Sequence, residues 1–113
     1  MLSRLATILA ISLLCACNST PTDWSGMSTD EISAWKAADF TPAVAQQWYH
    51  AGFPAELASR WQARGFELDT ATLWSDANFR PDEAHEWIVA GFDLEGAIEN
   101  RNKGLTPIQK KAD

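Results

Sequence analysis

Tryptophan recurs every thirteen residues through most of this chain. The spacing holds over five successive positions, Trp35, Trp48, Trp61, Trp74 and Trp87. Aligned on this period, the first position of each unit holds an apolar residue, the series Met27, Phe40, Phe53, Phe66, Phe79, Phe92 and Leu105. A fixed period of this kind is the signature of a repeat architecture, in which neighbouring units bury their apolar faces against one another.

Each unit carries the start and stop signals of one short helix. Ser28 and Thr41 are good N-cap residues, and Glu31 lies three residues after Ser28, as in a capping box. Proline stands at the first helical position in three units, as Pro42, Pro81 and Pro107. The thirteenth position holds only residue types that readily adopt the left-handed conformation, namely Asp39, Gly52, Gly65, Asn78, Gly91 and Gly104. The pattern predicts an all-α fold, a compact array of about six short helices, each ended by a Gly, Asn or Asp cap.

The positions of the aromatic residues predict how each helix ends. If the thirteenth residue is C′, the Trp is C3 and the aromatic residue that opens the next unit is C″, the two positions that touch in a Schellman motif. We therefore expect the Trp rings in the core, paired with the following Phe. The sixth and ninth positions are expected to lie on one helical face, with the twelfth close by, and Ala at the sixth and usually the twelfth position lets the helices approach closely. Positions seven, eight, ten and eleven, Gln46 and Gln47 among them, are expected to face water.

Both the length of the helices and the last unit limit the array. Helices of nine or ten residues are too short to be stable alone in water, so the units must pack together. In the last full unit Asn100 replaces Trp, Gly96 lies inside the helix and the neighbouring residues are polar, as expected for a capping repeat. Leu105 to Pro107 starts a seventh helix that the charged tail is expected to let fray.

The first residues form a targeting segment. Arg4 precedes an apolar run, residues 5–16, that is too short to span a bilayer and has the shape of a secretory signal. The run ends in Leu14-Cys15-Ala16-Cys17, which resembles the lipobox of bacterial lipoprotein precursors. The resemblance implies cleavage before Cys17 and attachment of acyl chains to Cys17, so that the membrane is a partner through this residue. The chain then has three parts: a lipoprotein signal peptide over 1–16, a lipid-anchored flexible tether over 17–26, and a helical repeat domain over 27–113. Trp24 is the exception within the tether, since its apolar ring can fold back onto the domain.

The residue after the lipid-bearing Cys directs sorting in double-membrane bacteria, where Asp favours retention in the inner membrane. Here it is Asn18, so the resemblance implies the outer membrane, facing the periplasm; the inner membrane and the cell surface stay open. An ordinary secreted protein and an uncleaved anchor are the alternatives to lipidation. The repeat itself, Phe-x-Pro-x-x-Ala-x-x-Trp-x-x-Ala-Gly, resembles tandem repeats of uncharacterised bacterial proteins, which carry no activity to transfer.

Charge and residue types exclude several functions. A net charge of −6 argues against nucleic acid as a partner. His50 and His85 have no neighbouring Cys and no repeated partner, so we expect two solvent-exposed surface histidines and no metal site. No catalytic motif and no cofactor-binding motif is found, and we expect a protein that is not an enzyme. Four apolar residues stand where the repeat predicts exposure and form the candidate partner patch: Tyr49, Leu73, Ile88 and Val89.

Two functional interpretations follow, and Trp exposure separates them. The first is a membrane-anchored, non-catalytic interaction module that binds another protein of the cell envelope, and it predicts that the five repeated Trp are buried. The second is a glycan- or peptidoglycan-binding lipoprotein, which predicts that at least two Trp rings lie in an open groove and stack on sugars. A structural spacer without a ligand is a third possibility that no residue excludes.

Overall fold

The computed structural model describes residues 20–107, which form an array of six helices and, within this range, no strand. Each helix has nine residues, and the connections between them have four. The helices are α2 (Thr29–Ala37), α3 (Pro42–His50), α4 (Ala55–Ala63), α5 (Leu68–Asp76), α6 (Pro81–Val89) and α7 (Leu94–Asn102). The predicted all-α array of short repeated helices is confirmed.

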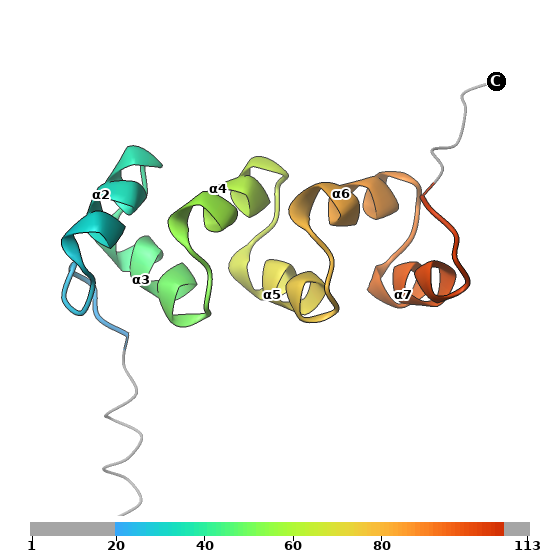
Figure 1. Cartoon of the computed structure of the whole chain (residues 1–113), viewed down its shortest axis with the longest axis horizontal. Coiled ribbons are helices and arrows are strands. Elements are labelled where there is room, and N and C mark those ends of the chain that lie inside the picture. The colour runs from blue at the N-terminus through green and yellow to red at the C-terminus, as the bar shows by residue number, and fades with distance from the viewer. Residues whose placement is uncertain (1–19, 108–113) are drawn as a thin grey trace, which may run out of the picture.

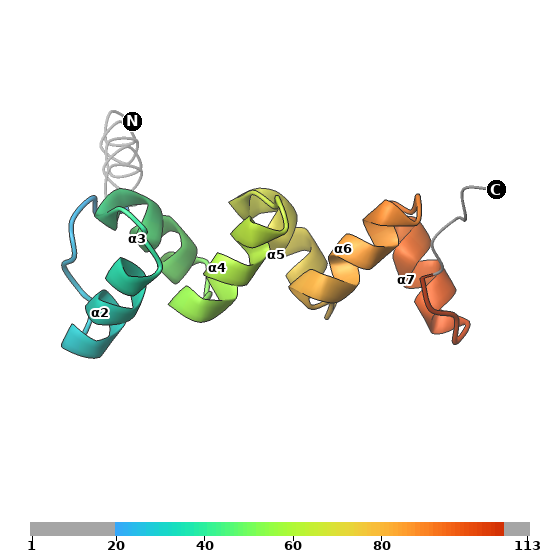
Figure 2. The ribbon, with the colours of Figure 1, turned by 90° about the horizontal axis from the view of Figure 1, so that it is seen from above.

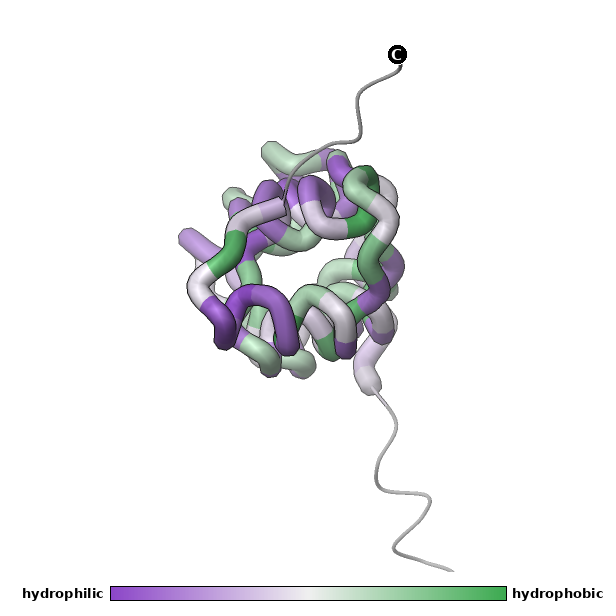
Figure 3. Tube along the Cα trace, turned by 90° about the vertical axis from the view of Figure 1, so that its right-hand side faces the viewer, coloured by the Kyte–Doolittle hydropathy of each residue, from purple (hydrophilic) through white to green (hydrophobic). Residues whose placement is uncertain are grey.

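The helices alternate between two layers. Figure 1 shows α2, α4 and α6 in one layer and α3, α5 and α7 in the other, so the chain crosses from layer to layer at every connection. The view from above shows the same steady progress from α2 to α7 (Figure 2). Seen along the array, the helices and their connections form a ring (Figure 3). The buried Trp and Phe side chains fill its interior, which makes the array a short solenoid.

The helix starts follow the predicted caps. The Ser28 hydroxyl accepts a hydrogen bond from the Glu31 N–H at 3.1 Å, and the Glu31 carboxylate accepts one from the Ser28 N–H at 2.8 Å, which completes the capping box. The Thr41 hydroxyl accepts from the Val44 N–H at the start of α3. Pro42 and Pro81 occupy the first positions of α3 and α6.

All six helices end in a Schellman motif. In α4, the N–H of Phe66 donates to the carbonyl of Trp61 at 3.0 Å, and the N–H of Gly65 donates to the carbonyl of Gln62 at 2.9 Å. The same two bonds close the other five helices. The six residues at C′ all have positive φ, including Asp39 at 66° and Asn78 at 69°. The predicted stop signals are therefore confirmed at every repeat.

The Trp–Phe pairs are confirmed as contacts of the core. The rings of Trp61 and Phe66 lie 4.8 Å apart at 89°, an edge-to-face pair, and the other four predicted pairs have centroids between 4.8 and 5.1 Å apart. Phe53 also approaches Trp61 of the next helix at 6.5 Å, which links successive units. The Ala at the sixth position is fully buried in all five units that have it: Ala45, Ala58, Ala71, Ala84 and Ala97.

One expectation about the helix faces is wrong, because Gln46, expected to face water, is fully buried. The twelfth position is the C-cap, beyond the last helical residue. Ala38 and Ala77 at this position are half-buried and pack against the core, whereas Ala51 is exposed. Phe at the first position supplies the larger buried side chain at the end of the helix.

Gln46 is buried because the segment before the first repeat folds back onto α3. Its Nε2 donates hydrogen bonds to the carbonyl oxygens of Asp23 and Ser25, the latter at 2.8 Å. Trp24 packs against the core, and the Lys36 ammonium lies 5.9 Å from the centroid of its ring. Trp24 therefore folds back onto the domain, and residues 23–26 are docked with it.

The C-terminal end differs from the interior of the array. α7 buries only Ala97 fully, and Phe92 is half-buried although the four preceding Phe residues are buried. Residues 105–107 are not helical, so the seventh helix does not begin there, and its remainder lies outside the described residues. Arg101 holds α7 in place through bonds from its guanidinium to the carbonyls of Ala77 and Asn78.

Candidate partner-binding surface

The four residues of the candidate patch lie on three helices and in both layers. Tyr49 belongs to α3 and Leu73 to α5, whereas Ile88 and Val89 belong to α6. Leu73, Ile88 and Val89 are 58%, 43% and 49% exposed, while Tyr49 is half-buried against the core. Because α6 is in the other layer from α3 and α5 (Figure 1), Ile88 and Val89 belong to a different layer from Tyr49 and Leu73. Ile88 and Val89 are adjacent in the sequence and both exposed, and they form one exposed apolar pair.

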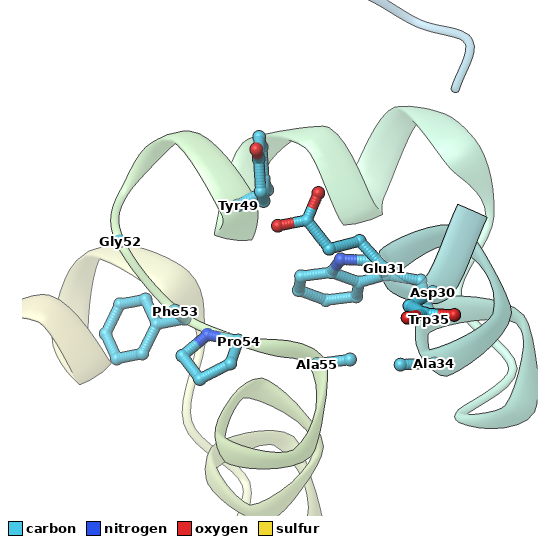
Figure 4. A pocket seen from close by; sticks show the side chains of 9 residues that line it. All are labelled: Asp30, Glu31, Ala34, Trp35, Tyr49, Gly52, Phe53, Pro54 and Ala55. Carbon is cyan, nitrogen blue, oxygen red and sulfur yellow. The ribbon is translucent and has the colours of Figure 1, made fainter. Parts of the chain in front are cut away.

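Tyr49 lines a hollow of about 440 Å³ where α2 faces the α3–α4 connection (Figure 4). Its walls are apolar, with Trp35 on α2 and Phe53 and Pro54 on the connection. Asp30 and Glu31 supply carboxylates at its edge. The lining residues are Asp30, Glu31, Ala34, Trp35, Tyr49, Gly52, Phe53, Pro54 and Ala55.

The two carboxylates of this hollow lie in the first turn of α2 and stabilise the start of that helix. The Glu31 carboxylate accepts the N–H of Ser28, and both acidic side chains stand in the first turn, where the helix dipole favours negative charge. The hollow thus combines an apolar wall with an anionic edge.

Ile88 lines a second hollow, of about 320 Å³, between α6 and the α4–α5 connection. His85, predicted to be exposed, is half-buried in its wall, and Arg64 at its edge forms an ion pair with Asp82 at 3.1 Å. His50, by contrast, is exposed as expected. Within residues 20–107 no group of three or more His, Cys, Asp or Glu side chains could hold a metal ion.

The repeated Trp rings are not available as a binding surface. Their exposed fractions are between 0 and 3%, including those of Trp35 and Trp87, which line hollows. A sugar face needs open access to an indole ring, and no such ring is offered by Trp35, Trp48, Trp61, Trp74 or Trp87. The expectation that the repeated Trp rings lie in the core is confirmed for these five residues.

Sequence reasoning missed two features near the ends of the array. Gln46 is expected on the solvent-exposed face, although it binds the docked segment. The one sequence signal for this role is that four other units have Ser, Thr or His at the seventh position, where this unit has Gln. Leu105, counted as part of the repeat, is 52% exposed and lines a hollow of about 290 Å³ with Trp87 and Phe92 at the end of the array.

The chain matches no known protein family, no curated protein and no solved structure. The predicted lipid-attachment residue, Cys17, and the signal segment 1–16 lie outside the described residues. Among residues 20–107, none of the helices has the length and apolar character needed to cross a membrane.

Proposed function

We propose that this chain is a bacterial lipoprotein whose repeat domain is a non-catalytic protein-interaction module, held by acylated Cys17 at the periplasmic face of the outer membrane. The observation that carries the proposal is the lipobox-like Leu14-Cys15-Ala16-Cys17 after an apolar run too short to span a bilayer. Two or more acyl chains anchor a protein stably, whereas one gives marginal binding.

The organisation of the domain supports an interaction role. Its aromatic side chains are committed to the core, and what remains on the surface is polar except for a few residues. Solenoids of short helices expose an extended surface on a rigid frame, which is the usual basis of partner binding in such folds. The exposed pair Ile88–Val89 and the hollow beside Tyr49 are the proposed contact sites for an envelope protein.

The anchor is tested by replacing Cys17 with Ser. Cells that express the native chain and the Cys17→Ser variant are grown with a clickable palmitate analogue and then fractionated. We expect label and membrane association only for the native chain, with the variant in the soluble fraction. A variant that remains with the membranes contradicts lipid anchoring at Cys17, and a density gradient of the native membranes reports which membrane holds the protein.

The contact sites are tested by photo-crosslinking. A photoreactive amino acid is introduced at Val89, with Gln47 on the exposed face of α3 as the matched control position. We expect a discrete crosslinked species from position 89 and none from position 47. Equal crosslinking from both positions, or none from either, contradicts a partner site at the Ile88–Val89 pair.

A further inference from the structure

The docked segment limits how far the array can lie from its anchor. Asp23 and Ser25 present their carbonyl oxygens to Gln46, and the Asp23 carboxylate accepts bonds from the Ser25 hydroxyl at 2.7 Å and the Ser25 N–H at 3.1 Å. Met27 closes the segment with a weak bond from its N–H to the carbonyl of Trp24 at 3.4 Å. Residues 23–26 thus take the place that the end of a preceding helix would have.

This segment is in register with the repeats. Gly26 falls at the thirteenth position and has φ of 85°. The helix-ending residues of the array also have positive φ. The hydrogen-bond acceptors of Gln46 on α3 lie 21 and 23 residues earlier in the sequence. The acceptors of Arg101 on α7, at the end of α5, lie 23 and 24 residues earlier, a similar separation. The segment therefore caps the N-terminal end of the solenoid and is fixed relative to α3.

Burial of Gln46 indicates that this contact is structural. The side chain is fully buried and its Oε1 has no hydrogen-bond partner among the described residues. Burying an amide oxygen without a partner costs free energy, so the two bonds from Nε2 and the packing of Trp24 must offset that cost. Release of the segment would remove both the hydrogen bonds of Gln46 and the packing of Trp24.

Only five residues, 18–22, lie between Cys17 and the docked Asp23, and a fully extended chain of these six residue steps spans at most about 21 Å. The short connection keeps the α2–α3 end close to any anchor at Cys17. The opposite half is more acidic: residues 67–107 carry nine acidic and three basic side chains, against five and three in residues 20–66. An anionic bilayer repels such a surface within about a Debye length.

We infer that the array stands on the membrane with its α2–α3 end next to the bilayer and its α7 end directed away from it. The inference rests on the proposed acylation of Cys17 and adds the orientation of the array to it. The docked segment sets which end is near the lipid, and the acidic half keeps the other end away. Ile88, Val89 and Leu105 then lie on the part of the domain that a partner reaches first.

The experiment attaches the chain 17–113 through the Cys17 thiol to a maleimide lipid in nanodiscs that contain an anionic lipid and a gadolinium-chelating lipid. Paramagnetic broadening of the backbone amide signals then reports distance from the bilayer. We expect the signals of α2 and α3 to lose most of their intensity and those of α6 and α7 to keep theirs. Equal broadening along the array would mean that it lies flat, which overturns the inference.

The contribution of the docked segment is tested with Gln46→Ala, and Gln47→Ala, an exposed neighbour on the same helix, is the matched control. Release of residues 23–26 lengthens the connection from Cys17 to Ser28 to eleven residue steps, about 39 Å at full extension, so the broadening gradient should flatten in Gln46→Ala only. An unchanged gradient together with fast hydrogen exchange at residues 24–27 overturns the role of the segment. If Gln46→Ala loses its helical circular dichroism, Trp24→Ala replaces it.

The chemical attachment separates this test from the proposed function. The thioether to the lipid is formed in vitro, so the orientation of the array can fail while palmitate labelling of the native chain in cells succeeds, and the reverse also holds. Each result therefore bears on one statement only.

Discussion

Gln46 and Arg101 form equivalent side-chain hydrogen bonds near opposite ends of the array. Each donates two hydrogen bonds to carbonyl oxygens at the end of the preceding segment in its own layer, Gln46 to Asp23 and Ser25 and Arg101 to Ala77 and Asn78. Arg101 also places its guanidinium carbon 3.8 Å from the centroid of the Phe79 ring. Polar side chains therefore hold the two terminal parts of the solenoid, where less apolar surface is available.

Replacement of Arg101 with Ala should lower the free energy of unfolding by about 1–3 kcal/mol, because hydrogen bonds to a charged group and a cation–π contact are lost together. Urea unfolding followed by circular dichroism measures the change. Arg60→Ala is the control, since Arg60 forms an exposed pair with Glu56 within one helix, and such pairs contribute about 0–1 kcal/mol. Equal effects of the two substitutions would show that Arg101 does not hold α7.

Gly65→Val should destabilise the domain by about 1–3 kcal/mol or more, because φ of 87° at this residue is unfavourable for a β-branched side chain. A Cβ added here would meet no atom within 4 Å, so the cost comes from the backbone alone. Gly65→Asn is the matched control, since Asn78 adopts φ of 69° at the equivalent position. The melting temperature should fall clearly for Val and little for Asn; identical values contradict the left-handed cap.

Trp61→Ala should cost about 3–5 kcal/mol, as in other large truncations in protein cores. Trp61 is fully buried, and its ring contacts both Phe53 and Phe66. Trp61→Phe should cost less, partly because the indole Nε1 has no hydrogen-bond partner among the described residues that the substitution would remove. Chemical denaturation measures both values, and a loss below about 1 kcal/mol for Ala would exclude a core role for this ring.

The docking of residues 23–26 should weaken in acid. The bonds from the Ser25 hydroxyl and N–H favour the ionised carboxylate and lower the pKa of Asp23. This contribution is present above the ordinary pKa of Asp, about 3.9, and is lost as the pH falls through the lowered value in the folded chain. Amide exchange at Ser25 should accelerate in this range relative to α4, and Asp23→Asn should remove the difference.

Tryptophan fluorescence of the soluble Cys17→Ser domain should be blue-shifted and resistant to acrylamide, because five of the six rings are buried. Isolated peptidoglycan should leave the emission unchanged. Red-shifted emission that becomes protected by peptidoglycan would instead favour the sugar-binding interpretation. Trp24→Phe is the control, because it removes the one ring that lies outside the repeated series and is half-buried.

The local features of this fold could be predicted from sequence because each arises within about fifteen residues. The Gly65 cap and the contact of Trp61 with Phe66 are fixed by the end of a single helix. The burial of Gln46 could not be predicted, since its partners lie more than twenty residues away and its amide resembles other polar residues of the wet face. The thirteen-residue period also does not predict that successive helices alternate between two layers. This alternation places the helices of Tyr49 and Ile88 in different layers.

The alternation of layers sets the step by which this architecture can grow. Insertion of one unit of thirteen residues between α4 and α5 would move every later helix to the opposite layer, and the faces of the two halves would no longer match. Insertion of two units restores the original relationship and adds one full turn to the ring seen in Figure 3. The sequence repeats every thirteen residues, but duplications that preserve a binding face have to come in pairs.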